Sequence, residues 1–291
     1  MTRGHDPDRP GRPRSAGLFA MATVVLLATG CAGSLGGVPV PGATATLPLP
    51  GPDAPGDDAR SPQADDAPPT GPLAGLTVVV DPGHNGGNAD ASEEINRQVP
   101  AGPGSKACDT VGAETADGYP EHAFTWDLAR RVQDRLETEG ARVVLTRTDD
   151  SGVGPCVDER AEIGNDAEAD AAISLHADGA PAGHRGFHVI APGEVPGYTE
   201  EIVEPSMRLA EAVRDHFAEH AGQPPAGYAG DDGIDVRTDL GGLNKSTVPK
   251  VFLEVGNMGD PDDAERLTDE AWRDRAADGV TAGLVEFLRR D

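Results

Sequence analysis

Two histidines and two glutamates occupy positions that are typical of chemically active side chains. His84 follows the apolar run that opens Leu76–Gly87 (LTVVVDPGHNGG), and His176 follows a second apolar run with the sequence AAISL. Glu121 stands near the start of a predicted helix, and Glu254 lies inside the apolar segment VFLEV. Since each histidine follows a predicted strand, these groups are expected to converge at one end of a sheet.

Two imidazoles and one carboxylate, here His84, His176 and Glu121, are a ligand set that hydrolytic zinc sites use, with the fourth position left to water. A carboxylate inside an apolar strand should have a raised pKa, which suits Glu254 to act as a general base and acid. Glu114 is an alternative ligand to Glu121, but it lies in a glycine-rich loop with no helix to aim it. Because the set is dispersed and contains no compact HExxH motif, spacing alone leaves the zinc assignment open.

The surrounding periodicity predicts alternating strands and helices. The apolar run before His84 has no polar alternation, which is typical of a strand covered on both faces. Pro120 and Glu121 open a helix whose apolar residues recur every four positions as far as Gly140. Further strands are predicted at Arg142–Thr146, Ala171–Leu175 and Val251–Val255, with a short edge strand at Gly186–Ile190. Further helices are predicted at Val157–Ala167 and Pro205–His220, after Asp260-Pro261, and through Ala276, Val280, Leu284 and Leu288.

Two stretches carry no clear period and are predicted to be loops. One runs roughly from Asn85 to Tyr119 and is long enough to be either functional or pinned by Cys108. The other, Gln223–Pro249, is expected to line a cleft. The pattern as a whole predicts an α/β fold: a single domain with a mostly parallel, twisted sheet flanked by helices, and the site at its strand ends.

The first part of the chain reads as an export signal followed by a tether. A basic start precedes the apolar run Ala16–Leu27, which is too short to span a bilayer, and small residues lead to Cys31. This resembles a bacterial lipobox, so we expect residues 1–31 to be a signal that leaves Cys31 lipidated at the outer face of the cytoplasmic membrane. The alternative is an ordinary secretory signal and release to the cell wall. Residues 32–72, rich in Pro, Gly, Ala and Asp, are expected to be a disordered linker, and residues 73–291 the catalytic domain.

Charge and cysteine usage narrow the possible partners. The net charge of −26 argues against nucleic acid, whose phosphates require clustered Lys and Arg. The glycine loop behind His84 has no following lysine, so nucleotide binding is not expected. With Cys31 assigned to the signal, Cys108 and Cys156 remain, and in an exported domain we expect them to form a disulfide. Free thiols or a metal site are the alternative, which the absence of a CxxC pair disfavours.

The motifs taken together resemble the zinc-dependent N-acetylmuramoyl-L-alanine amidases of the amidase type 3 family. The matching pieces are VVVDPGH, the helix opening at Glu121, ERAEIGNDAEADAAISLHADG and VFLEVGNM, in this order from about Leu73 onward. The resemblance implies one Zn²⁺ held by His84, Glu121 and His176, with Glu254 as catalytic acid and base. It also implies hydrolysis of the amide between the lactyl group of N-acetylmuramic acid and L-alanine, in peptidoglycan or muropeptides.

Several assignments around this core are left open. Asp81 is expected either to orient a histidine ligand or to be a carboxylate in a turn at the strand end. His188 stands where many relatives have glutamate, and it is a candidate to line the substrate groove. Asn244, in GGLNKS, is a candidate substrate contact, with a turn role as the alternative. The rival functions are a catalytically silent cell-wall binding or regulatory protein on the same fold, and a zinc peptidase acting on stem peptides.

Overall fold

The computed structural model describes residues 70–290, and these contain a six-stranded sheet in the order β4, β1, β5, β8, β6, β7. The predicted signal, Cys31 and most of the predicted linker lie outside the described residues. All neighbouring strands are parallel except β6 and β8, so the predicted mostly parallel sheet is confirmed. The strands are β1 (Thr77–Pro82), β4 (Arg142–Leu145), β5 (Ala171–Asp178), β6 (His188–Pro192), β7 (Ile234–Arg237) and β8 (Lys250–Asn257).

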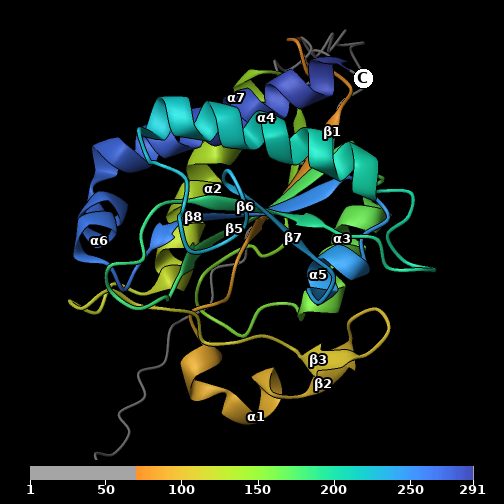
Figure 1. Cartoon of the computed structure of the whole chain (residues 1–291). Coiled ribbons are helices and arrows are strands. Elements are labelled where there is room, and N and C mark those ends of the chain that lie inside the picture. Colours follow the sequence, from red (N-terminus) through yellow and green to blue (C-terminus); the bar gives the residue numbers. More distant parts are fainter. Residues whose placement is uncertain (1–69, 291) are drawn as a thin grey trace, which may run out of the picture. The chain divides into compact units, whose positions relative to one another are not determined.

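Helices cover both faces of this sheet (Figure 1). On one face lie α2 (Glu121–Thr138), α4 (Val203–Ala221) and α7 (Glu270–Arg290), and α6 (Pro261–Thr268) packs beside them. On the other lie α3 (Val157–Asp166) and the short α5 (Gly241–Asn244). No helix within residues 70–290 is both long enough and apolar enough to cross a membrane.

The apolar residues predicted from the sequence pattern form the larger hydrophobic core, between the sheet and the helices α2, α4 and α7. Alternate residues of β1, Val78 and Val80, point toward α2, whose stripe from Phe124 to Leu136 is fully buried against them. Val79 points to the opposite face and packs in a smaller cluster with Ala172. Both faces of β1 are therefore covered, as the unbroken apolar run predicts.

Besides this apolar cluster, the face of the sheet beneath α3 holds a buried carboxylate, Asp81, whose charge is neutralised by its neighbours. Asp81 Oδ1 accepts hydrogen bonds from Thr146 at 2.6 Å and from Arg160 at 2.8 Å, while Oδ2 accepts one from Ser174 at 2.8 Å and lies 3.6 Å from Lys250 Nζ. Burial alone would raise the pKa of Asp81, but the two cations outweigh it and hold that pKa below its usual range. The prediction that Asp81 orients a histidine ligand is wrong, because both of its oxygens are used within this cluster.

Three predicted boundaries differ from the structure. β6 is not an edge strand, because β7 pairs with its outer side. β7 and α5 both lie in Gln223–Pro249, which was predicted to be loop; each has only four residues, too few to show a period. β5 continues to Asp178, so His176 projects from the strand itself rather than from a turn after it.

The long segment between β1 and α2 is only partly loop. It contains the short helices η2 (Asn88–Asp90) and α1 (Ser92–Ile95) and a hairpin of β2 (Gln98–Pro100) and β3 (Ser105–Ala107). A disulfide joins Cys108, directly after this hairpin, to Cys156 at the start of α3, with the Cα atoms 4.4 Å apart. The predicted pairing is confirmed, and it fixes the segment that runs on to the site.

Removing this disulfide should destabilise the domain. The bridge closes a 48-residue loop, for which chain entropy gives an upper estimate of about 4 kcal/mol. We expect the double variant Cys108→Ser/Cys156→Ser to unfold at a clearly lower urea concentration than the oxidised protein. The reduced wild-type protein is the matched control and should behave like the double variant. An unchanged unfolding midpoint in both would contradict this role.

Candidate metal centre and active site

His84 is held at the end of β1 by the backbone and by an aspartate from the long segment. Its backbone has φ of 59°, the left-handed region that side chains other than glycine rarely adopt. Its Nδ1 lies 3.0 Å from Asp109 Oδ1 and 3.1 Å from the Thr110 carbonyl oxygen. Since both partners are acceptors, Nδ1 carries the proton, and Nε2 is left to face Glu121 Oε1 at 3.2 Å.

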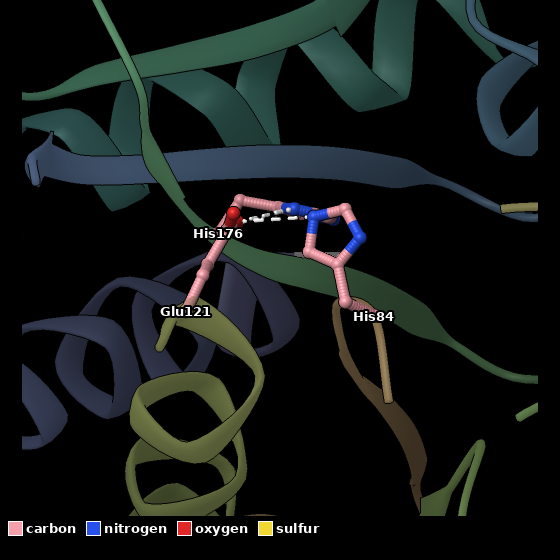
Figure 2. A group of neighbouring side chains, drawn as sticks. All are labelled: His84, Glu121 and His176. Carbon is pink, nitrogen blue, oxygen red and sulfur yellow. Dashed lines mark hydrogen bonds and ion pairs between the residues drawn. The ribbon is translucent and has the colours of Figure 1, made fainter. Parts of the chain in front are cut away.

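Glu121 and His176 complete a group that Figure 2 shows converging from three elements. Glu121 lies in the first turn of α2, and its Oε1 is 3.0 Å from His176 Nδ1. The backbone N–H groups of Ala113 and Ala177 donate to the two Glu121 oxygens at 2.8 and 3.1 Å, which fixes the carboxylate. One ligand atom from each of His84, Glu121 and His176 lies within 4.8 Å of the other two. The sequence-predicted metal ligands are therefore brought together.

Close packing keeps the His176 ring in place. Phe252 stacks on one side of it, with ring centroids 5.3 Å apart and planes 13° from parallel. Gly83 lies on another side, where a Cβ atom would stand 2.2 Å from His176 Cε1. Only glycine at this position leaves room for the ring, which explains the glycine directly before His84.

The electrostatics of the group suit a cation. Burial lowers the pKa of His84, but Glu121 and Asp109 outweigh burial and raise it to about 10 in the absence of a metal. Burial raises the pKa of Glu121, but the two histidines outweigh it and lower that pKa below its usual range. Two imidazole nitrogens and a fixed carboxylate oxygen fit a divalent metal ion, whose binding would displace the proton that His84 shares with Glu121.

A second group of possible ligands within the described residues lies on α4 and consists of His216, Glu219 and His220. His216 Nε2 is already 2.6 Å from Glu286 Oε2, and Glu219 and His220 are exposed. The first group is the better metal site because its three side chains come from three elements and are positioned by buried partners.

Glu254 lies beside the metal ligands because of strand register. β8 runs parallel to β5, and Glu254 is paired directly with His176. Its Oε2 is buried and has no hydrogen-bond partner. Burial raises the pKa of Glu254 well above its usual value, and the nearby charges of Glu121 and Asp178 raise it further. A carboxyl group with a raised pKa beside a metal site is suited to accept and return a proton.

An open cavity passes over these residues. It is lined by the three proposed ligands and Glu254, together with Ile190, Arg237, Leu240 and Phe252. A second cavity adjoins it behind Phe252, beneath α3 and the hairpin. Arg237 was not singled out from the sequence, because it lies in the short β7. Its guanidinium lines the groove and is paired with the Asp239 carboxylate by two hydrogen bonds, at 2.7 and 2.8 Å.

The two predicted substrate contacts are not positioned to touch substrate. Asn244 is buried, and its Nδ2 donates to the carbonyl oxygens of Ala101 and Thr238, so it has the turn role that was the alternative. His188 is only 4% exposed and is not among the residues that line the cavity. It lies in β6, where it is paired with Glu254 in the ladder.

Asp109 is the residue that sequence reasoning missed. It follows Cys108 in a segment without periodicity, and it takes the orienting position that had been considered for Asp81. Its Oδ2 also lies 3.3 Å from Arg160, which keeps the carboxylate ionised. The one signal in the sequence that could have indicated a fixed position for Asp109 is that it directly follows Cys108, which was predicted to form a disulfide.

Asp109→Asn should weaken metal binding without removing a ligand. An amide is a poorer acceptor for the His84 N–H and removes a buried negative charge, so affinity for Zn²⁺ is expected to fall about 10- to 100-fold. A competition titration against a chelating dye measures this. Asp117→Asn, an exposed position in the same segment, is the control. Equal affinities for the wild-type protein and Asp109→Asn would show that Asp109 does not support His84.

Comparison with known proteins shows the family of the chain. Residues 78–286 match the family model described as N-acetylmuramoyl-L-alanine amidase. The chain is 43% identical over 217 residues to N-acetylmuramoyl-L-alanine amidase Rv3717 of Mycobacterium tuberculosis, covering 74% of this chain and 88% of that protein. The crystal structure of the amidase Ami1 from Mycobacterium smegmatis superposes with a TM-score of 0.71 at 43% identity, over 75% of this chain and 99% of that one. The apo form of Ami1 from Mycobacterium abscessus gives a TM-score of 0.69 at 44% identity, over 74% and 100% of the two chains. The chain therefore belongs to the N-acetylmuramoyl-L-alanine amidase family.

Proposed function

We propose that this protein is a zinc-dependent N-acetylmuramoyl-L-alanine amidase. It hydrolyses the amide between the lactyl group of N-acetylmuramic acid and the L-alanine of the stem peptide, in peptidoglycan or in soluble muropeptides. The observation that carries the proposal is the pairing of Glu254 with His176. Glu254 is thereby the neighbour of His84, Glu121 and His176, which supports roles for it as proton acceptor and for them as ligands.

In the proposed mechanism, His84, Glu121 and His176 hold the metal, and Asp109 keeps the His84 ring in its ligating orientation. Bound zinc supplies Lewis acidity, which lowers the pKa of water and polarises a carbonyl. Glu254 accepts the proton of the attacking water and returns it to the nitrogen of the leaving L-alanine. Its raised pKa matches this double use, because a carboxyl group of ordinary pKa would hold the proton too weakly to deliver it.

The same observation weighs against the first rival function, and the family relationship weighs against the second. A wall-binding or regulatory protein has no need of a buried carboxylate beside its ligand set, because desolvating that group costs stability without helping to bind a polymer. A peptidase acting on stem peptides would use the same chemistry on a different bond. It is the family relationship, rather than the chemistry of the site, that favours the muramoyl amide.

A digest of one muropeptide tests the proposal. The full chain, loaded with Zn²⁺, is incubated with a disaccharide carrying a stem peptide, and the fragments are identified by mass. We expect the intact disaccharide and a free stem peptide with an L-alanine amine. Cleavage between two amino acids would favour the peptidase, and no cleavage, with zinc bound, would favour the silent binder.

We also propose that the protein is exported and anchored to the outer face of the cytoplasmic membrane through a lipid on Cys31. The lipobox-like sequence before Cys31 and the following linker, which is rich in Pro and Gly, support this placement. In a bacterial expression host, radiolabelled palmitate should be incorporated into the wild-type chain and not into Cys31→Ser. Release of unlabelled wild-type protein to the medium would instead support an ordinary secretory signal.

A further inference from the structure

A row of three side chains crosses the sheet at the active site. In the ladder, Glu254 of β8 is paired with His176 of β5 on one side and with His188 of β6 on the other. Residues directly opposite each other on neighbouring strands point to the same face, with Cβ atoms about 4.5–5.5 Å apart. The preceding residue of β8, Leu253, and its partner Val189 point instead into the core beneath the helices. Glu254 is therefore flanked by a metal ligand and by a second histidine that the proposed mechanism does not use.

Glu254 and His188 each carry a buried polar atom without a partner. Glu254 Oε2 and His188 Nδ1 both have no hydrogen bond, although a buried polar atom normally has one. The two atoms are chemically complementary, because a carboxylate oxygen accepts and an imidazole nitrogen can donate. They do not bond to each other in the structure, so their pairing requires rotation of one of the two side chains.

The surroundings of His188 bury its ring and disfavour its protonated form. Burial lowers the pKa of His188, against the opposing influence of Asp178 and Asp235. The ring of Tyr228 packs against the imidazole at 80°, with ring centroids 6.0 Å apart. With only 4% of His188 exposed, the ring is closed off from solvent and placed to support a neighbouring side chain rather than to grip substrate.

We propose that His188 is a positioning residue for Glu254: its Nδ1–H donates to Glu254 Oε2 and so turns the other oxygen, Oε1, toward the cavity. The inference rests on the proposed role of Glu254 as acid and base. If the Glu254 side chain moves between rotamers, it presents a carboxylate oxygen to the water only part of the time. A hydrogen bond to the buried oxygen holds it in one orientation.

Two substitutions of His188 distinguish a role in positioning Glu254 from a role in packing alone. His188→Asn keeps an amide N–H close to the position of Nδ1, whereas His188→Leu fills the space without a donor. For muropeptide hydrolysis, we expect His188→Leu to lower kcat about 10- to 100-fold with KM changed less than about threefold, and His188→Asn to keep kcat within a few-fold of the wild type. His220→Leu, at an exposed position on α4, is the control and should change neither constant. Equal loss in both His188 variants, or a rise in KM alone, would overturn the proposal.

A double-mutant cycle tests whether His188 acts through Glu254. If it does, adding His188→Leu to Glu254→Gln should lower the residual kcat no further, whereas an independent role would multiply the two losses. Urea unfolding of the same four proteins gives a readout that needs no turnover. Coupled shifts of the unfolding midpoint would support the pairing even if the amidase function failed, and additive shifts would contradict it. His188→Met, which also lacks a donor, replaces His188→Leu if the leucine variant does not fold.

Discussion

Glu254→Gln is expected to reduce kcat for muropeptide hydrolysis by about 10²- to 10⁴-fold while zinc stays bound. Glutamine fills the same space in β8 but can neither accept the proton of water nor deliver one to the leaving nitrogen. The residue contributes no ligand atom to the group of His84, Glu121 and His176, so the metal content should remain one per chain. Steady-state kinetics on a purified muropeptide and elemental analysis of the same protein sample measure both quantities.

Glu162→Gln, at an exposed position on α3, is the matched control and should leave both kcat and zinc content unchanged. Loss of zinc from Glu254→Gln would mean that Glu254 is a ligand, and the assignment of roles would have to be reversed. Retention of full activity would show that another group moves the proton.

Removing a ligand is the change with the other large expected effect. His176→Ala leaves one imidazole and one carboxylate, too few to hold zinc in a three-ligand catalytic site. We expect the purified variant to contain almost no zinc and to lose activity by at least about a thousandfold, because water without the metal returns to a pKa of ~15.7. Metal analysis after dialysis and a muropeptide digest check the two parts of this expectation.

Chelation of the wild-type protein provides the comparison for this variant. The chelated wild type should regain activity when Zn²⁺ is returned, and His176→Ala should not. His220→Ala, which removes a histidine from the exposed group on α4, should keep both zinc and activity. If His220→Ala also lowered activity or halved the metal content, the group on α4 would have to be included in the description of the metal sites.

Much of the core of this site is predictable from the sequence because local patterns are enough to determine it. An unbroken apolar run predicts a buried strand, and the carboxyl ends of parallel strands meet at one edge. His84 and His176 follow from this rule, and Glu121 follows from its place in the first turn of a strongly periodic helix. Glu254 is conspicuous because a carboxylate in an apolar strand has a high desolvation cost.

The side chains that hold these site residues in place could be identified only from the tertiary structure. Asp109 reaches His84 across 25 positions in a segment without periodicity, held there by the bridge from Cys108. Asp81, closer in sequence, points beneath α3 instead, where Arg160 neutralises it. A period of two tells which residues share a face of a strand, but it does not tell which helix or cation will cover that face.

The sequence by itself therefore determined the family, the fold class and the residues of the proposed reaction, because these follow from residue types in local strand and helix patterns. The disulfide followed from the two cysteines that remain in a domain expected to be exported. The tertiary structure decided which side chains hold those residues in place. The row of His176, Glu254 and His188 exists only because β6 inserts antiparallel between β8 and β7. Strand order depends on packing between segments distant in sequence, and no local pattern encodes it.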